Sequence, residues 1–151
     1  MDQDSFPFPF WAMLAAATAW VALIYGISIA VRRAKGKPIF PKVPDGALYA
    51  EKWASGRWAS NCLIVAVTDK AVSVVPRFPF NMGFLPEIYG LERNSPMASI
   101  REARRLRSFG LFNNVAIVYD DGIQRELRLK VRRPEAFLDA VGRSPLVRVS
   151  N

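Results

Sequence analysis

The sequence predicts one transmembrane α-helix followed by a mainly-β domain, a barrel or sandwich of about seven strands, that ends in a C-terminal helix. An apolar segment without charged residues lies near the N-terminus, and alternating apolar and polar residues dominate the second half of the 151-residue chain. A short segment that begins with Pro and ends with Gly follows the last alternating run. We therefore expect five parts: 1–9 as a short extracytoplasmic N-terminus, 10–31 as the transmembrane helix, 32–46 as a basic linker, 47–142 as the β domain and 143–151 as a tail.

The N-terminal apolar segment is long enough to cross a bilayer. The segment Phe10–Val31 has 22 residues and no charged side chain, so as a helix it would be about 33 Å long, against a hydrocarbon core of about 30 Å. A cleaved signal peptide would start with a positive region and end at small residues. This segment instead follows Asp2 and Asp4 and ends at Arg32 and Arg33. We expect it to stay in the protein as a membrane anchor.

The charges on either side of the segment predict its orientation. No Lys or Arg precedes it, and five basic residues follow it before the first acid, Asp45: Arg32, Arg33, Lys35, Lys37 and Lys42. Basic flanks stay on the cytoplasmic side. We expect a single-pass protein of the cell (inner) membrane, with its N-terminus outside and its C-terminal domain in the cytoplasm.

The overall charge restricts the class of partner. The net charge is +8, which would draw a membrane-tethered domain to an anionic leaflet. Nucleic acid is the rival partner for a basic surface, but a membrane tether argues against it. We expect the lipid bilayer and a membrane protein as partners, with no nucleic acid and no small-molecule substrate.

The first part of the β domain reads as a strand followed by a hairpin. The linker 32–46 contains three prolines and is extended in character. Ala47–Trp53 is expected to be a strand, and Cys62–Val67 is a continuous β-branched run of the kind found in buried strands. Asp69-Lys70 separates it from Ala71–Val75, which predicts a hairpin.

The second hairpin and the last helix have stronger signals. Val115–Tyr119 and Arg125–Val131 alternate strictly around Asp120-Asp121-Gly122, which predicts a hairpin with a Gly-containing turn. Pro134 suits the first position of a terminal helix, and Gly142 suits the C′ position just after it.

The order of these elements, about seven short strands and then a helix, resembles a bacterial pleckstrin-homology-like (PH-like) domain. The segment Ser95-Pro96-Met97-Ala98-Ser99-Ile100 is similar to the (I)-P-L-x-x-I segment common in that family. The resemblance covers roughly residues 47–142. It implies a bent barrel capped by its C-terminal helix, and a binding or scaffolding module; likeness of fold does not name the ligand.

One face of the membrane helix is a candidate contact with another helix. Small residues recur every four positions, at Thr18, Ala22, Gly26 and Ala30. A row of small residues lets two membrane helices approach closely. The hypothesis is association with another membrane protein or with a second copy; the alternative is an Ala-rich composition without a partner.

Two basic sets are candidates for anionic headgroups or an acidic partner. The first is juxtamembrane: Arg32, Arg33, Lys35 and Lys37. Its simpler role is to enforce topology. The second is Arg101, Arg105 and Arg107, which have the same parity in a strand and would line one sheet face; the alternative is an ordinary solvated face.

The segment Pro76–Gly90 is expected to be a long apolar loop, because its three prolines disfavour a central strand. Its candidate partner-binding or membrane-binding side chains are Phe78, Phe80, Met82, Phe84 and Leu85. Exposed, they would form an interaction surface or dip into the membrane. The alternative, which the composition favours, is that the aromatic residues fold back over the mouth of the barrel and complete the core.

No catalytic set can be assembled from the sequence. Histidine is absent, the single cysteine Cys62 lies in an apolar run, and neither a phosphate-binding glycine loop nor a nucleophile-elbow motif is present. We expect no enzyme activity, no metal site and no cofactor. The leading hypothesis is a membrane-anchored interaction or scaffolding module at the cytoplasmic face, and the alternative is a sensor of anionic lipid headgroups.

Overall fold

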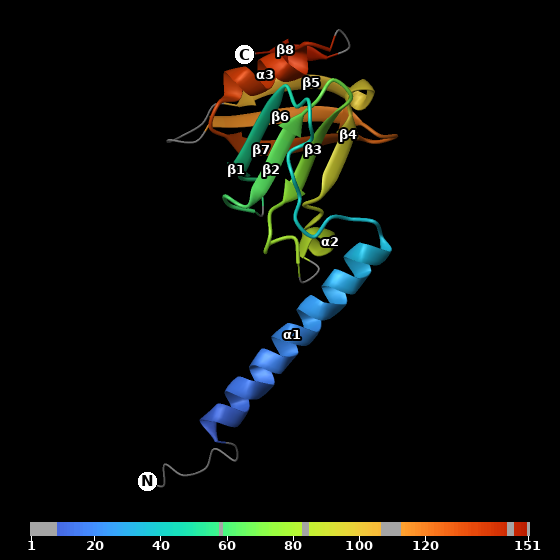
Figure 1. Cartoon of the computed structure of the whole chain (residues 1–151). Coiled ribbons are helices and arrows are strands. Elements are labelled where there is room, and N and C mark those ends of the chain that lie inside the picture. The colour runs from blue at the N-terminus through green and yellow to red at the C-terminus, as the bar shows by residue number, and fades with distance from the viewer. Residues whose placement is uncertain (1–8, 58, 83–84, 107–112, 145–146, 151) are drawn as a thin grey trace, which may run out of the picture. The chain divides into compact units, whose positions relative to one another are not determined.

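The computed structural model describes residues 9–57, 59–82, 85–106, 113–144 and 147–150 (Figure 1). The chain divides into two compact units, one ending at Ile39 and the other beginning at Phe40. The first contains a long helix, and the second is mainly β with a C-terminal helix. This arrangement of a long apolar helix before a mainly-β domain is the predicted one.

The helix α1 runs from Phe10 to Ala34 and is long and apolar enough to cross a membrane. It extends three residues beyond the predicted end at residue 31, because the residues that end the helix are centred on Gly36. Gly36 has φ of 65° and donates its N–H to Arg33 O at 3.0 Å, while the Lys37 N–H reaches Arg32 O at 2.9 Å. This pair of bonds is the Schellman motif, which satisfies carbonyls that a helix end would otherwise leave unpaired.

The first sheet is antiparallel and contains the first predicted hairpin. Its strands in order are β1 (Tyr49–Ala54), β2 (Leu63–Val67), β3 (Ala71–Pro76) and β4 (Arg93–Pro96). Every residue of β2 is buried, as expected for a continuous apolar run in the middle of a sheet. The register pairs Leu63 with Pro76 and Val67 with Val72, so the hairpin prediction is confirmed.

The second sheet contains the other predicted hairpin. Its strands in order are β7 (Gln124–Val131), β6 (Asn113–Asp120), β5 (Ile100–Leu106) and β8 (Arg148–Ser150). The turn is closed by the Gly122 N–H, which donates to Asp120 Oδ1 at 3.1 Å, and Gly122 has φ of 98°. The strand β8 pairs parallel with β5 and was not predicted.

The two sheets enclose one core that α3 (Pro134–Gly142) covers at one end (Figure 1). The short 3-10 helix η1 (Met97–Ser99) turns the chain from β4 into β5. Phe137 is fully buried and meets the Tyr49 ring edge-on, with ring centroids 5.4 Å apart. An edge-to-face pair of this kind adds to the stabilisation from burial itself.

The prediction that Gly142 follows α3 as its C′ residue is wrong. Gly142 is the last residue of α3, and Arg143 forms the C-cap in a right-handed conformation. The reason for a small residue is packing: a Cβ at Gly142 would lie 2.9 Å from Val149 Cγ2. The parallel strand β8 therefore lies close to the end of α3.

Buried Glu51 joins the edge of the first sheet to the second. The Tyr49 hydroxyl donates to Glu51 Oε2 at 2.6 Å, and the backbone N–H of Arg132 donates to the same oxygen at 2.9 Å. Ser55 and Lys130 exchange two backbone hydrogen bonds nearby, at 3.1 and 2.8 Å. Burial, followed by the hydrogen bond to Glu51, raises the pKa of Tyr49. These bonds connect β1 to the end of β7.

We expect Glu51→Leu to lower the free energy of unfolding by about 2 kcal/mol, because the buried Tyr49 hydroxyl and the part-buried Arg132 N–H both lose their acceptor. Tyr49→Phe is the matched control: it removes one donor together with its bond and leaves the Arg132 N–H paired, so its cost is smaller. Urea unfolding in mild detergent, followed by circular dichroism, measures both. Equal stability of Glu51→Leu and the wild type would contradict this role for Glu51.

Candidate interaction surfaces

The four small residues of α1 are all exposed on the helix: Thr18, Ala22, Gly26 and Ala30. The Thr18 hydroxyl donates to Leu14 O at 2.8 Å, so the helix itself satisfies this polar group. A Cβ at Gly26 would meet no atom of the described chain within 4 Å. Packing within the described chain therefore gives no reason for glycine at this position.

The juxtamembrane basic residues do not all project outward. Arg32 is buried, and its guanidinium donates to Pro38 O, from Nη2 at 3.1 Å and from Nε at 3.4 Å. Arg33 and Lys35 are exposed, and Lys37 is half-buried. Arg32 thus bonds to the turn after α1, while Arg33 and Lys35 are the better placed for headgroups.

The predicted apolar loop contains a helix, so the expectation of irregular structure throughout 76–90 is wrong. Pro76 ends β3, and α2 spans Leu85–Tyr89. Phe78 and Phe80 are 44% and 46% exposed, whereas Met82 is buried. The favoured alternative, in which the aromatic residues complete the core, is therefore wrong for Phe78 and Phe80. Phe84 and the side chain of Leu85 lie outside the described residues.

Exposed apolar side chains gather at one end of the first sheet. The register brings Ala54, Leu63 and Pro76 to the same end, and Figure 1 shows α2 at this end and α3 at the other. Six exposed residues belong to the segments that meet there, and we call them the apolar end: Phe40, Trp53, Phe78, Phe80, Ile88 and Tyr89.

Contacts within the β domain hold the apolar end together. The Phe40 and Phe78 rings lie 4.9 Å apart. The Arg77 guanidinium stacks 3.6 Å above the Trp53 ring, and the Arg77 N–H donates to Cys62 O at 2.7 Å. A cation over an indole face stabilises both groups. These contacts connect Phe40, the end of β1 and the segment after β3.

Trp53 belongs to this surface but was not predicted to do so. In a regular strand it would point to the same side as Tyr49 and Glu51, which are buried. A register shift between Glu51 and Ala54 interrupts that alternation, and Trp53 is 48% exposed. No residue pattern in the sequence predicts this register shift.

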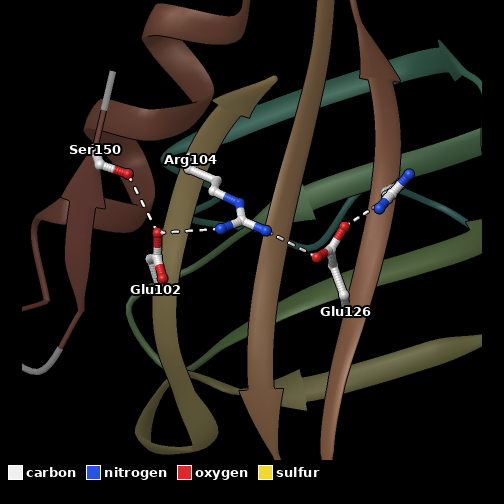
Figure 2. Close-up of polar contacts among 5 residues, drawn as sticks. Glu102, Arg104, Glu126 and Ser150 are labelled. Atoms are coloured by element: carbon white, nitrogen blue, oxygen red, sulfur yellow. Dashed lines mark hydrogen bonds and ion pairs between the residues drawn. The ribbon is translucent and has the colours of Figure 1, made fainter. Parts of the chain in front are cut away.

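The outer face of the second sheet carries a network of opposite charges (Figure 2). Arg104 Nη2 lies 2.9 Å from Glu126 Oε2, and its Nη1 lies 3.9 Å from Glu102 Oε1. The Ser150 hydroxyl donates to Glu102 at 3.2 Å, and Arg128 Nε donates to Glu126. The network therefore runs from β8 across β5 and β6 to β7.

The network lies over buried β6 residues. Ala116 is paired with Arg104 on one side and Arg128 on the other, and Val118 is paired with Glu102 and Glu126. Both are buried, although they point away from the core that Ile117 and its neighbours form. The long charged side chains therefore cover small apolar residues on the outer face.

The structure describes two of the three arginines in the predicted face of β5. A register shift between Ile100 and Glu102 breaks the alternation on which the prediction depended. Arg101 is exposed beside this shift, and Arg105 forms an ion pair with Glu135 of α3. Arg107 lies outside the described residues.

Two further observations bear on chemistry. Cys62 is buried, and burial raises the pKa of its thiol, which disfavours the reactive thiolate. Within the described residues, no group of three or more His, Cys, Asp and Glu side chains could hold a metal ion.

Glu126→Gln tests the charge network. The hydrogen bond from Arg128, and then the charges of Arg128 and Arg104, lower the pKa of Glu126 against the opposing effect of burial. A lowered folded-state pKa stabilises the fold above the unfolded-state pKa, about 4.3 for Glu, and this stabilisation disappears as the pH falls through the folded value. We expect the free energy of unfolding of the wild type to exceed that of the variant by up to about 1 kcal/mol at pH 7. The two free energies should converge below about pH 4. Thermal unfolding of both proteins across this pH range measures the difference. A difference in stability that persists in acid would contradict this role for the ionised Glu126 carboxylate.

No protein-family model matches the sequence, and comparison with curated proteins found none that is similar. The fold is a long apolar helix followed by a mainly-β domain of two four-stranded sheets with a C-terminal helix. Function must therefore be inferred from the small-residue face of α1, the apolar end and the charged residues.

Proposed function

We propose that this protein is a membrane-anchored, non-catalytic interaction module that binds another membrane protein at the cytoplasmic face. The 25 residues of α1 would span about 37 Å, more than a hydrocarbon core needs. Large apolar side chains such as Trp20, Leu23 and Ile27 are exposed on it. Such a surface would cause aggregation in water, whereas a bilayer accepts it because a helix satisfies its own backbone groups.

The charges support an orientation with the β domain inside the cell. Arg33 and Lys35 are exposed directly at the end of α1, and basic residues flanking a membrane helix remain cytoplasmic. In this orientation Trp11, which is 70% exposed, lies at the outer interface, where Trp is favoured.

The PH-like character of the β domain belongs to the same proposal. A first sheet of four strands, a second sheet formed by the strands that follow, and a helix over one end agree with that architecture. The segment Ser95–Ile100 contains the turn η1 between the two sheets. A domain of this kind implies binding or scaffolding, and its ligand must come from its surfaces.

The observation that carries the proposal is the small-residue face of α1. At 3.6 residues per turn, positions seven apart differ by only about 20°, so Ala15 lies beside Ala22 and Ala19 lies beside Gly26. Between Ala15 and Gly26 this widens the row into a patch of small residues. Ile29 and Arg33 border the patch, because they lie seven positions after Ala22 and Gly26. Because the described chain places nothing against Gly26, the face is open to a second helix, which small residues allow to approach closely.

The alternative function, sensing of anionic headgroups, has less support. Arg104, Arg105 and Arg128 are each paired with a glutamate, which offsets the positive charge on which headgroup attraction depends. Among the described residues of the two predicted basic sets, exposed Arg33, Lys35 and Arg101 are the better candidates. We therefore place protein contact first.

Ala22→Leu and Ala17→Leu test the proposal as a matched pair. Both make the same chemical change on an exposed helix position, but Ala17 lies about 140° around the helix from Ala22 and opposite Gly26. We expect Ala22→Leu to reduce the amount of co-purifying membrane protein, or of a differently tagged second copy, by about tenfold or more, equivalent to about 1.4 kcal/mol. Ala17→Leu should leave it unchanged.

Affinity purification of the full-length protein in mild detergent, with quantitative mass spectrometry, provides the measurement. Gly26→Leu should behave as Ala22→Leu does. Equal effects of Ala22→Leu and Ala17→Leu, or a wild-type protein that is monomeric and without a partner, would refute association through this face.

A further inference from the structure

We infer that the apolar end of the β domain docks into the headgroup region of the same bilayer that holds α1. The inference depends on the proposed membrane anchor and adds a second contact with the membrane. Its ligand is a lipid surface, and its residues are the six exposed side chains already defined as the apolar end.

The composition of the apolar end fits an interface between water and hydrocarbon. Trp53 and Tyr89 are 48% and 50% exposed, and both side chains combine an apolar ring with a polar group, as do the aromatic belts of membrane proteins. Phe78, Phe80 and Ile88 add purely apolar area that would insert more deeply. So many exposed apolar residues at one end of a small domain indicate a binding surface.

The surface is already formed in the folded domain, so docking need not order it. Beyond the ring contacts of Phe40 and Trp53, backbone hydrogen bonds shape the segment after β3. The Asn81 N–H donates to Arg77 O at 3.0 Å, and the Met82 N–H donates to Pro79 O at 3.0 Å. A preformed surface loses little conformational entropy on binding.

The covalent tether favours the bilayer over a free protein as the occupant. Five residues lie between Ala34, the end of α1, and Phe40, and the six Cα–Cα steps of this connection span at most about 20 Å in any conformation. Phe40 is itself part of the apolar end. Such a short connection keeps the membrane at a high effective concentration, so a contact that would be weak between free molecules suffices.

Apolar contact, more than charge, carries the docking. Arg77 and exposed Arg57 belong to this end of the first sheet and would meet an anionic leaflet favourably. Glu87 of α2 and Glu92 after it oppose this attraction. We therefore expect docking on neutral phosphatidylcholine as well, with little sensitivity to salt.

The test places one fluorescent label at each of three positions of the full-length chain, reconstituted in phosphatidylcholine nanodiscs. In a Cys62→Ala background, Phe80→Cys reports on the apolar end and Val21→Cys on the middle of α1. Ile123→Cys is the aqueous control, because this residue is 65% exposed. It also lies in the turn after β6, close in sequence to Tyr119, which pairs with Ile100. Ile100 shortly follows Pro96, which pairs with Ala71 at the end of the first sheet away from the apolar end. Quenching by spin-labelled lipid reports contact with the bilayer, and quenching by iodide reports contact with water.

We expect the label at Phe80 to show blue-shifted emission, quenching by the spin-labelled lipid and protection from iodide, while the label at Ile123 shows the reverse. A Phe80 label that iodide reaches fully would overturn the inference. A label protected from iodide but not quenched by lipid would also overturn it, and would point to a protein occupant. The label at Val21 separates the two proposals: if lipid quenches it while the Phe80 label stays in water, the anchor stands and only the docking fails, and if lipid does not quench it, both fail.

Discussion

The apolar surface of α1 is the constraint on which the account of this protein depends. Its exposed side chains from Phe10 to Ile27 cannot be left in water without strong self-association, and the Schellman motif at Gly36 ends the helix just beyond the first basic residues. In the proposed arrangement a bilayer covers these side chains, and the basic residues Arg33 and Lys35 keep the end of α1 on the cytoplasmic side. In this proposal the anchor keeps the β domain close to the membrane and to other membrane proteins.

A few buried polar groups join the two sheets of the β domain. Glu51 accepts hydrogen bonds from Tyr49 and from the backbone of Arg132, joining β1 to β7 in a region where unpaired donors would be costly. On the outer face of the second sheet, glutamates pair with the arginines instead of leaving a uniformly basic surface. On this face, as far as the structure describes it, the paired charges therefore do not form a uniformly basic patch, and the apolar end is the more distinctive feature.

Features that depend on local sequence were predictable, and those that depend on strand register were not. The long helix, the fully buried β2 and the β6–β7 hairpin follow from composition and alternation over consecutive residues. The register shift at Ile100 and Glu102 does not, and it interrupts the alternation on which the expected arginine face depended. The small-residue face of α1 could be predicted because helical spacing is regular, whereas the place of Trp53 in the apolar end required the register of β1. The three-residue strand β8 has too few residues for any periodic signal.

Protease accessibility in sealed membrane vesicles tests whether α1 spans a bilayer with the β domain on the cytoplasmic side. Trypsin would be added to inverted and to right-side-out vesicles containing the full-length protein with a C-terminal tag. Arg33 and Lys35, exposed at the end of α1, offer cleavage sites. We expect the tag to be lost from inverted vesicles and to be protected in right-side-out vesicles until detergent is added. Loss from right-side-out vesicles alone would reverse the orientation, and release of the intact chain into the soluble fraction would contradict the membrane anchor itself.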